Sequence, residues 1–156
     1  MKRTVIRSFI VLAVVLIALQ FVSSTGNKGD AYGADDITHV VAVPDTVKQI
    51  LEVACYDCHS NHTTYRWYSS VQPVGIWIGH HINEGKEHLN FSEFAGYTTQ
   101  RKVKKLEHLA EQVKDGRMPM PSYLRMHPEA VLTEGQKEIL INWANKCNTV
   151  FSTAGR

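Results

Sequence analysis

The chain has 156 residues, of which 44% are hydrophobic and 21% charged, a balance that suits one folded domain and excludes wholesale disorder. Its net charge of +2 comes from 17 basic and 15 acidic side chains, but Lys2, Arg3 and Arg7 lie in an N-terminal segment without acidic residues. The rest of the chain therefore carries 14 basic against 15 acidic residues, and this balance gives no reason to expect nucleic acid as a partner.

The N-terminal segment, residues 1–24, is predicted to direct export. After the basic residues comes an apolar run from Phe9 to Val22, interrupted only by Gln20. This run is shorter than the roughly 20 residues of a membrane span and has the length of a signal-peptide core. A tilted, uncleaved membrane anchor through residues 5–22 is the alternative. Both interpretations place the protein in the periplasm, and the second ties it to the inner membrane.

Residues 25–43 are rich in glycine, serine and aspartate, which predicts a linker before a folded domain at 44–156. Apolar residues at helical spacing in that domain predict helices at 44–55, at 75–89, at 99–116 and from 133 onward. Gly116 is a stop signal, and Thr133 with Gln136 forms a capping-box pattern. Because no convincing strand pair is visible, we expect an all-α fold of about four helices with long loops.

The most informative motif lies where the first predicted helix ends, at Cys55-Tyr56-Asp57-Cys58-His59. This is C-x-x-C-H, the attachment pattern of c-type haem. Two thiols three residues apart can reach the two vinyl groups on one porphyrin edge and form thioethers. The adjacent His59 can then supply a neutral imidazole nitrogen to the iron as the proximal ligand.

Other interpretations of the two cysteines fit less well. A thioredoxin-like redox pair needs a βαβ context, which is not visible in the sequence. A zinc site could recruit Cys55, Cys58 and His62, but it lacks an obvious second pair of ligands at a usual spacing. A structural disulfide is compatible with export, but it leaves His59 without a role.

A distal iron ligand is expected in the stretch DGRMPMPSY, which places Met118 and Met120 in a proline-stiffened loop after the third helix. Met118 is favoured because it follows the Gly116 helix stop directly, and Met120 is the alternative. The competing histidine ligands are His80, His81 and His127. A sixth position left open is the remaining possibility.

Two stretches, CYDCHSNHTTYRWYSSVQPVGIWIGHHINEGKEHLNFSEF and GRMPMPSYLRMHPEAVLTEGQKEILINWA, resemble the bacterial haem-binding domain family, a cytochrome c-like group with one C-x-x-C-H. With the third helix they span about residues 44–147. The resemblance implies a small cytochrome c-like domain wrapped around one covalent haem c, with His59 as the proximal ligand and Met118 as the distal ligand. Members often have M-P-P where this chain has Met118-Pro119-Met120-Pro121, so Met120 remains open as the alternative.

Similarity to small cytochromes c suggests a role for Pro73, and the chemistry and position of several other residues suggest roles for them. The Pro73 carbonyl is expected to accept a hydrogen bond from the proximal imidazole, and Arg66 to neutralise a haem propionate. Ser92 is expected to cap the turn into the third helix, and Cys147 to be a buried free thiol. The aromatic residues expected around the haem are Trp67, Tyr68, Trp77 and Tyr123.

These features together predict a monohaem c-type cytochrome that transfers electrons in the cell envelope to or from an unidentified redox partner protein, and that is not an enzyme. The alternative is a haem-based sensor or a peroxidase-like module whose sixth iron position opens. A peroxidase-like module would need a distal acid and base, for which the sequence offers His80 or His81.

Overall fold

The computed structural model describes residues 2–22 and 26–154, so the predicted signal, linker and domain extend beyond it at residues 1, 23–25 and 155–156. Within the described residues the fold is all-α, as expected, with seven α-helices and no strand. The four predicted helices are α2 (Asp45–Ala54), α4 (Val74–His88), α5 (Thr99–Lys114) and α7 (Glu134–Ala154). The additional helices are α1 (Lys2–Leu19) and the single turns α3 (Tyr56–His59) and α6 (Pro121–Leu124).

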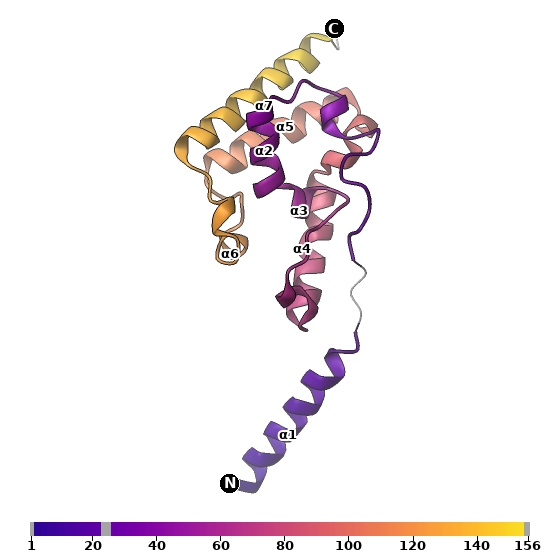
Figure 1. Cartoon of the computed structure of the whole chain (residues 1–156), viewed down its shortest axis with the longest axis vertical. Coiled ribbons are helices and arrows are strands. Elements are labelled where there is room, and N and C mark those ends of the chain that lie inside the picture. The colour runs from indigo at the N-terminus through magenta and orange to yellow at the C-terminus, as the bar shows by residue number, and fades with distance from the viewer. Residues whose placement is uncertain (1, 23–25, 155–156) are drawn as a thin grey trace.

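The core lies where α5 and α7 run along each other and α2 packs across them (Figure 1). Each of these helices has one apolar face, and burial of that face drives their association. Short 3-10 turns close the core: η1 (Ile37–His39), η2 (Trp67–Ser70), η3 (Phe91–Gly96) and η4 (Pro128–Ala130). The fully buried apolar residues include Ile37, Leu51, Phe91, Phe94, Leu106 and Leu140.

The helix ends largely follow the predicted signals. Thr133 and Gln136 form the expected capping box, in which the Gln136 amide N–H donates to Thr133 Oγ1 at 3.2 Å and Thr133 N–H donates to Gln136 Oε1 at 2.9 Å. Cys147 is buried on α7 as a free thiol, as predicted. The cap of α5 differs: Thr98 accepts from the Arg101 N–H, whereas Ser92 lies inside η3 and donates to the Ala31 carbonyl.

The stretch predicted as a linker, residues 25–43, belongs to the folded unit in its described part. Ile37 and Asp36 are fully buried, and Asp36 Oδ2 accepts a hydrogen bond from the Tyr56 hydroxyl at 2.9 Å. The Ala95 N–H donates to the Asp35 carbonyl at 2.9 Å. Buried side chains and shared backbone hydrogen bonds are properties of a domain, so the domain begins before Pro44.

The N-terminal helix α1 extends away from the other helices and buries none of its residues (Figure 1). In the described part of the chain, no helix combines the length and the apolar content needed to cross a membrane. The assignment of residues 1–24 as a signal or anchor stays a prediction.

Candidate functional site

The two cysteines and His59 are brought to one cavity by a tight turn of the backbone. Cys55 ends α2 and precedes α3, and its carbonyl accepts hydrogen bonds from the amides of Cys58 at 3.2 Å and His59 at 2.9 Å. Residues three and four apart in a helical turn lie on the same side, so both thiols and the imidazole face the same space. All three line a single cavity of about 400 Å³.

The imidazole of His59 is oriented by a backbone carbonyl. Its Nδ1 lies 2.8 Å from the Leu89 oxygen. Because a carbonyl only accepts, Nδ1 carries the proton and Nε2 keeps its lone pair, which is the tautomer that binds a metal through Nε2. Burial also lowers the pKa of His59, which favours the neutral ring.

The structure corrects the acceptor that similarity to small cytochromes c suggested. Leu89, directly after α4, takes the role expected of Pro73. The Pro73 carbonyl instead accepts from the Trp77 amide at 3.1 Å, and Pro73 is the cap residue from which α4 begins. The His59 imidazole is therefore positioned by the end of α4 rather than by the loop before it.

The two thiols are protonated at neutral pH. Burial and the neighbouring Cys58 raise the pKa of Cys55 to about 12, and burial and Asp57 raise the pKa of Cys58 to about 11. Redox-active cysteine pairs depend on a lowered pKa, so these raised values count against a thioredoxin-like pair. Both cysteines are free, not joined in a disulfide.

Gly85 lets α4 pass close to the second cysteine. A Cβ atom on Gly85 would lie 2.8 Å from the Cys58 carbonyl oxygen and 3.4 Å from the Cys58 Cβ. Contact this close leaves no room for a methyl group without displacement of α3 or α4. Glycine at this position thus sets the distance between the cysteine turn and the helix that ends at the His59 acceptor.

Substitution of Gly85 by alanine is expected to lower the free energy of unfolding by about 1–3 kcal/mol, because the added methyl overpacks the contact with Cys58. Chemical denaturation measures the change. The matched control is Gly96→Ala, where a Cβ meets no atom within 4 Å. Equal stability of the two variants would show that α3 and α4 are not held this closely in solution.

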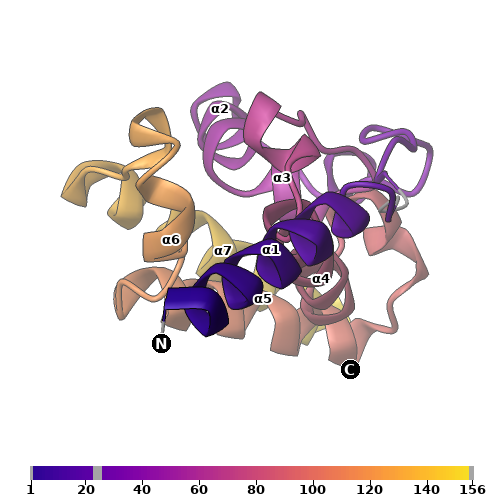
Figure 2. The same ribbon diagram turned by 90° about the horizontal axis from the view of Figure 1, so that it is seen from below.

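The wall of the cavity is largely apolar. The size of about 400 Å³ falls within the roughly 300–1,000 Å³ of small-molecule and cofactor sites. Its apolar surface comes from the end of α2, the residue after α4, the start of η3, α5 and the segment before α7. The residues are Ala54, Leu89, Phe91, Leu109, Val113 and Leu132. Viewed from below, α2 and α3 lie across from α5, with α6 at one side (Figure 2). The cavity lies among these elements.

Both loop methionines line the cavity. Gly116, with φ of +66°, turns the chain after α5, and the amide of Met118 then donates to the Gln112 carbonyl at 3.1 Å. Glycine adopts this left-handed conformation without the strain that a Cβ would cause. The turn therefore carries Met118 back toward the end of α5, while Met120 lies farther along and also reaches a second cavity.

Of the histidines considered as distal ligands, only His81 lines the cavity. His80 is two-thirds exposed and pairs with Glu84 at 3.3 Å. His127 lines the second cavity and is held by a tyrosine and a glutamate. His88 and His108 also line the first cavity, which the sequence alone did not indicate because no motif connects them to the cysteines.

A second cavity of about 280 Å³ adjoins the first and shares Cys58, His81, Met120 and Tyr123 with it. Tyr68 and Trp77 line it, so three of the four aromatic residues expected near the cofactor border the site. Trp67 lines neither cavity and is 77% exposed, contrary to expectation.

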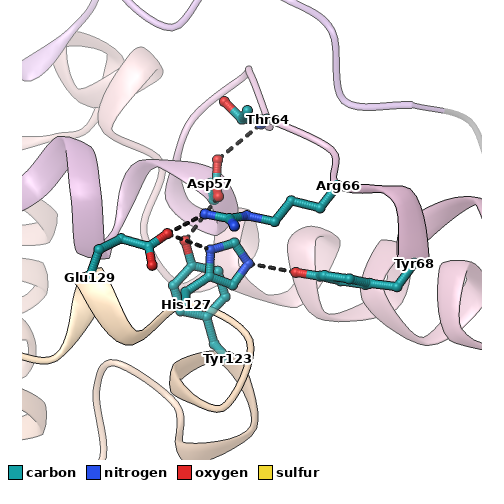
Figure 3. A network of polar contacts seen from close by, with 7 residues as sticks. All are labelled: Asp57, Thr64, Arg66, Tyr68, Tyr123, His127 and Glu129. Carbon is teal, nitrogen blue, oxygen red and sulfur yellow. Dashed lines mark hydrogen bonds and ion pairs between the residues drawn. The ribbon is translucent and has the colours of Figure 1, made fainter.

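Asp57, between the two cysteines, connects them to the methionine loop (Figure 3). Its Oδ1 accepts from the Thr64 amide at 2.9 Å, and its Oδ2 accepts from the Tyr123 hydroxyl at 2.9 Å. The Tyr123 ring stacks on His127, with ring centroids 4.0 Å apart. Tyr123 lies three residues after Met120, so this hydrogen bond holds the methionine loop against the cysteine turn.

His127, only 5% exposed, is the centre of the same network (Figure 3). Its Nδ1 faces Glu129 Oε1 at 3.4 Å, and its Nε2 lies 2.6 Å from the Tyr68 hydroxyl. With the proton on Nδ1, Nε2 accepts from Tyr68. Arg66, expected to neutralise a propionate, forms an ion pair with Glu129 and lines the second cavity.

Removal of the Tyr123 hydroxyl in Tyr123→Phe is expected to lower the free energy of unfolding by about 1–3 kcal/mol, because it leaves a carboxylate oxygen of Asp57 without its partner. The free energy of unfolding is measured by denaturation for Tyr123→Phe, Asp57→Asn and the double variant. This double-mutant cycle separates the energy of the Tyr123–Asp57 hydrogen bond from the effects of each substitution alone. A double variant whose loss equals the sum of the two single losses would contradict direct coupling between these residues.

The architecture and the site together define a helical protein with a cofactor cavity bordered by two free cysteines, an oriented histidine and two methionines. Residues 14–146 match the sequence profile of the haem-binding domain, which is most of the chain, so the chain belongs to the haem-binding domain family. No curated protein and no solved structure matches it. The match begins before residue 26, in agreement with the packing of the 26–43 stretch on the domain.

The residues present fit haem. The cavity is apolar, of cofactor size, and holds a neutral imidazole whose Nε2 is free for iron, together with thioether sulfurs from methionine. Haem is accordingly the bound partner of this domain. Cys55, Cys58, His59, Met118 and Met120 are the residues of this cavity whose chemistry suits its attachment and ligation.

Proposed function

We propose that the protein is a monohaem c-type cytochrome that transfers electrons in the cell envelope. Cys55 and Cys58 hold one haem through thioether bonds, His59 is the proximal ligand, and Met118 is the distal ligand, with Met120 as the alternative. The observation that carries this proposal is the hydrogen bond from His59 Nδ1 to the Leu89 oxygen, in a cavity that both free cysteines share.

The hydrogen bond matters because it prepares His59 for iron before any cofactor arrives. A ring free to rotate or to exchange tautomers would lose entropy on ligation, whereas this ring is held by the chain. The raised pKa values of the two thiols leave them as neutral groups beside an apolar cavity, which suits permanent covalent attachment better than reversible redox exchange.

Met118 is the preferred distal ligand because the chain itself positions it. The left-handed Gly116 and the hydrogen bond from the Met118 amide to the Gln112 carbonyl set its backbone at the cavity. Prolines on both sides of Met120 stiffen the same loop. Haem supplies one-electron chemistry at iron, and these residues supply its ligation and its apolar surroundings.

An export signal supports placement in the periplasm. Lys2, Arg3 and Arg7 precede an apolar helix with no buried residue, a pattern typical of signal peptides and N-terminal anchors. Covalent attachment of haem to C-x-x-C-H is completed outside the cytoplasm in bacteria, so the motif and the signal agree. Residues 5–22 would provide the tether to the inner membrane if the segment is not removed.

His81 favours the second function, a sensor or peroxidase-like module, because it is a titratable side chain that lines both cavities. Absorption spectra of the oxidised and reduced protein distinguish the two. For the cytochrome we expect low-spin ferric haem, the weak long-wavelength band of methionine-ligated iron, and no direct binding of carbon monoxide. High-spin iron in the oxidised protein, together with carbon monoxide binding to the reduced protein without loss of a ligand, would contradict electron transfer as the function and support the alternative.

A further inference from the structure

The turn η2 and the start of α4 form an exposed apolar tip, which we define as Trp67, Val71, Val74, Ile76 and Trp77. All five side chains are exposed, and Trp67 is the most exposed of the three tryptophans, at 77%. From Trp67 to Asn83 the sequence contains no Asp, Glu, Lys or Arg, although charged residues make up 21% of the chain. Exposed apolar clusters of this kind mark interaction surfaces.

Hydrogen bonds and a close backbone contact hold the tip in place. Gln72 is buried and its Oε1 accepts from the Ile76 amide at 2.9 Å, while the Val71 amide donates to the Tyr68 carbonyl at 3.1 Å. A Cβ on Gly75 would lie 2.3 Å from the Ser69 carbonyl oxygen, so η2 and α4 approach each other too closely to leave space between them. The backbone that carries the tip is therefore held in place, and its five apolar side chains are exposed.

The residues directly after the apolar N-terminal helix contact the domain beside this tip, at Gln72. Gln20 Nε2 donates to the Gln72 carbonyl at 3.0 Å, the Gln72 amide donates to Gln20 Oε1 at 3.0 Å, and Gln72 Nε2 donates to the Val22 carbonyl at 3.0 Å. Figure 1 shows α1 leaving the molecule next to the beginning of α4. The segment proposed to enter the membrane during export thus ends beside the uncharged surface.

We propose that the tip docks on the lipid bilayer, with Trp67 and Trp77 at the boundary between headgroups and acyl chains. This inference rests on the proposed export and adds a second, non-spanning membrane contact made by the haem domain itself. Tryptophan favours that boundary because its ring is apolar while its N–H can bond to water or headgroups. The absence of formal charge predicts binding to neutral lipid that salt does not weaken.

Docking would also orient the haem site. Val74 and Trp77 of the tip line the second cavity, which shares Cys58 and Met120 with the haem cavity. The side of the haem site formed by these residues would then face the bilayer, where a membrane-bound redox partner could approach it.

The test is photocrosslinking of the full-length holoprotein in phosphatidylcholine vesicles that contain a phosphatidylcholine with a photoactivatable acyl chain. We expect lipid adducts, located by peptide mass spectrometry, on Trp67 and Trp77 and none on Val131, which is exposed and apolar but lies outside the tip. The adducts should persist at high salt. The absence of lipid adducts on the tip, or an adduct yield no higher than that on Val131, would overturn the proposal. Protein dimers crosslinked through the tip would instead show that the tip binds a second copy of the chain, which would also overturn it.

Matched variants make the test specific. Val71→Ser, at an exposed valine of the tip, should reduce adducts on Trp67 and Trp77 severalfold, whereas Val131→Ser should leave them unchanged. An equal effect of both variants would also overturn the proposal. The absorption spectrum of the same sample separates the two claims: a haem-bearing protein without tip adducts refutes docking alone, and a protein without haem refutes the proposed function.

Discussion

Replacement of both Cys55 and Cys58 by alanine is expected to abolish covalently held haem. The two thiols share the cavity with His59, and among the residues that the structure describes they are the only cysteines that line it, so no other thiol there can form a thioether. Haem in the double variant would be held by ligation and apolar contact alone. Acidified acetone should therefore extract all of it, and a denaturing gel stained for haem should show no coloured band.

The control is Cys147→Ala, which removes the third cysteine from the apolar face of α7, outside both cavities. This variant should keep its haem through extraction, with at most a modest loss of stability from the small cavity it creates. A haem-stained band of normal intensity from the variant that lacks Cys55 and Cys58 would contradict attachment at the motif.

Met118→Leu is expected to open the sixth coordination position of the iron. Leucine has nearly the volume of methionine but no sulfur, so the cost in stability should stay below about 1.5 kcal/mol while the ligand is lost. The oxidised variant should become high-spin and lose the long-wavelength methionine band, and after reduction the ferrous variant should bind carbon monoxide directly. Absorption and electron paramagnetic resonance spectra of the purified variant measure these changes.

Met120→Leu is the matched comparison, because Met120 lies in the same loop and lines the same cavity. It should keep the spectrum of the unchanged protein. If Met120→Leu alone opened the iron, Met120 would be the ligand. If neither substitution changed the spin state, methionine ligation would be wrong, and His81, the other distal candidate at the cavity, would become the ligand to test.

The helices could be predicted from sequence because their signals are local. Apolar residues at helical spacing located α2, α5 and α7, and the Thr133–Gln136 pattern located the start of α7. The placement of Cys55, Cys58 and His59 at one cavity could be predicted for the same reason, since the three residues lie within one helical turn of each other. The α5 cap was missed because Thr98 and Ser92 both precede the helix and are both chemically suitable.

Other features depend on contacts between distant residues. The acceptor of His59 is a backbone carbonyl, which every residue has, so no side chain marks Leu89 for this role. Residues 26–43 have the composition of a linker, and only the three-dimensional structure shows that Ile37 fills the core and that Asp36 meets Tyr56. Likewise, Tyr68 and His127 are 59 residues apart, and their contact follows from how the loop around α6 folds back.

The mass of the intact protein under denaturing conditions tests the central claim most directly. Protein purified from cells that can attach haem to C-x-x-C-H is unfolded in acid, which releases any haem held only by ligation, and is then weighed by electrospray mass spectrometry. Two thioether bonds at Cys55 and Cys58 predict the mass of the polypeptide plus one haem. The mass of the bare polypeptide would contradict the account.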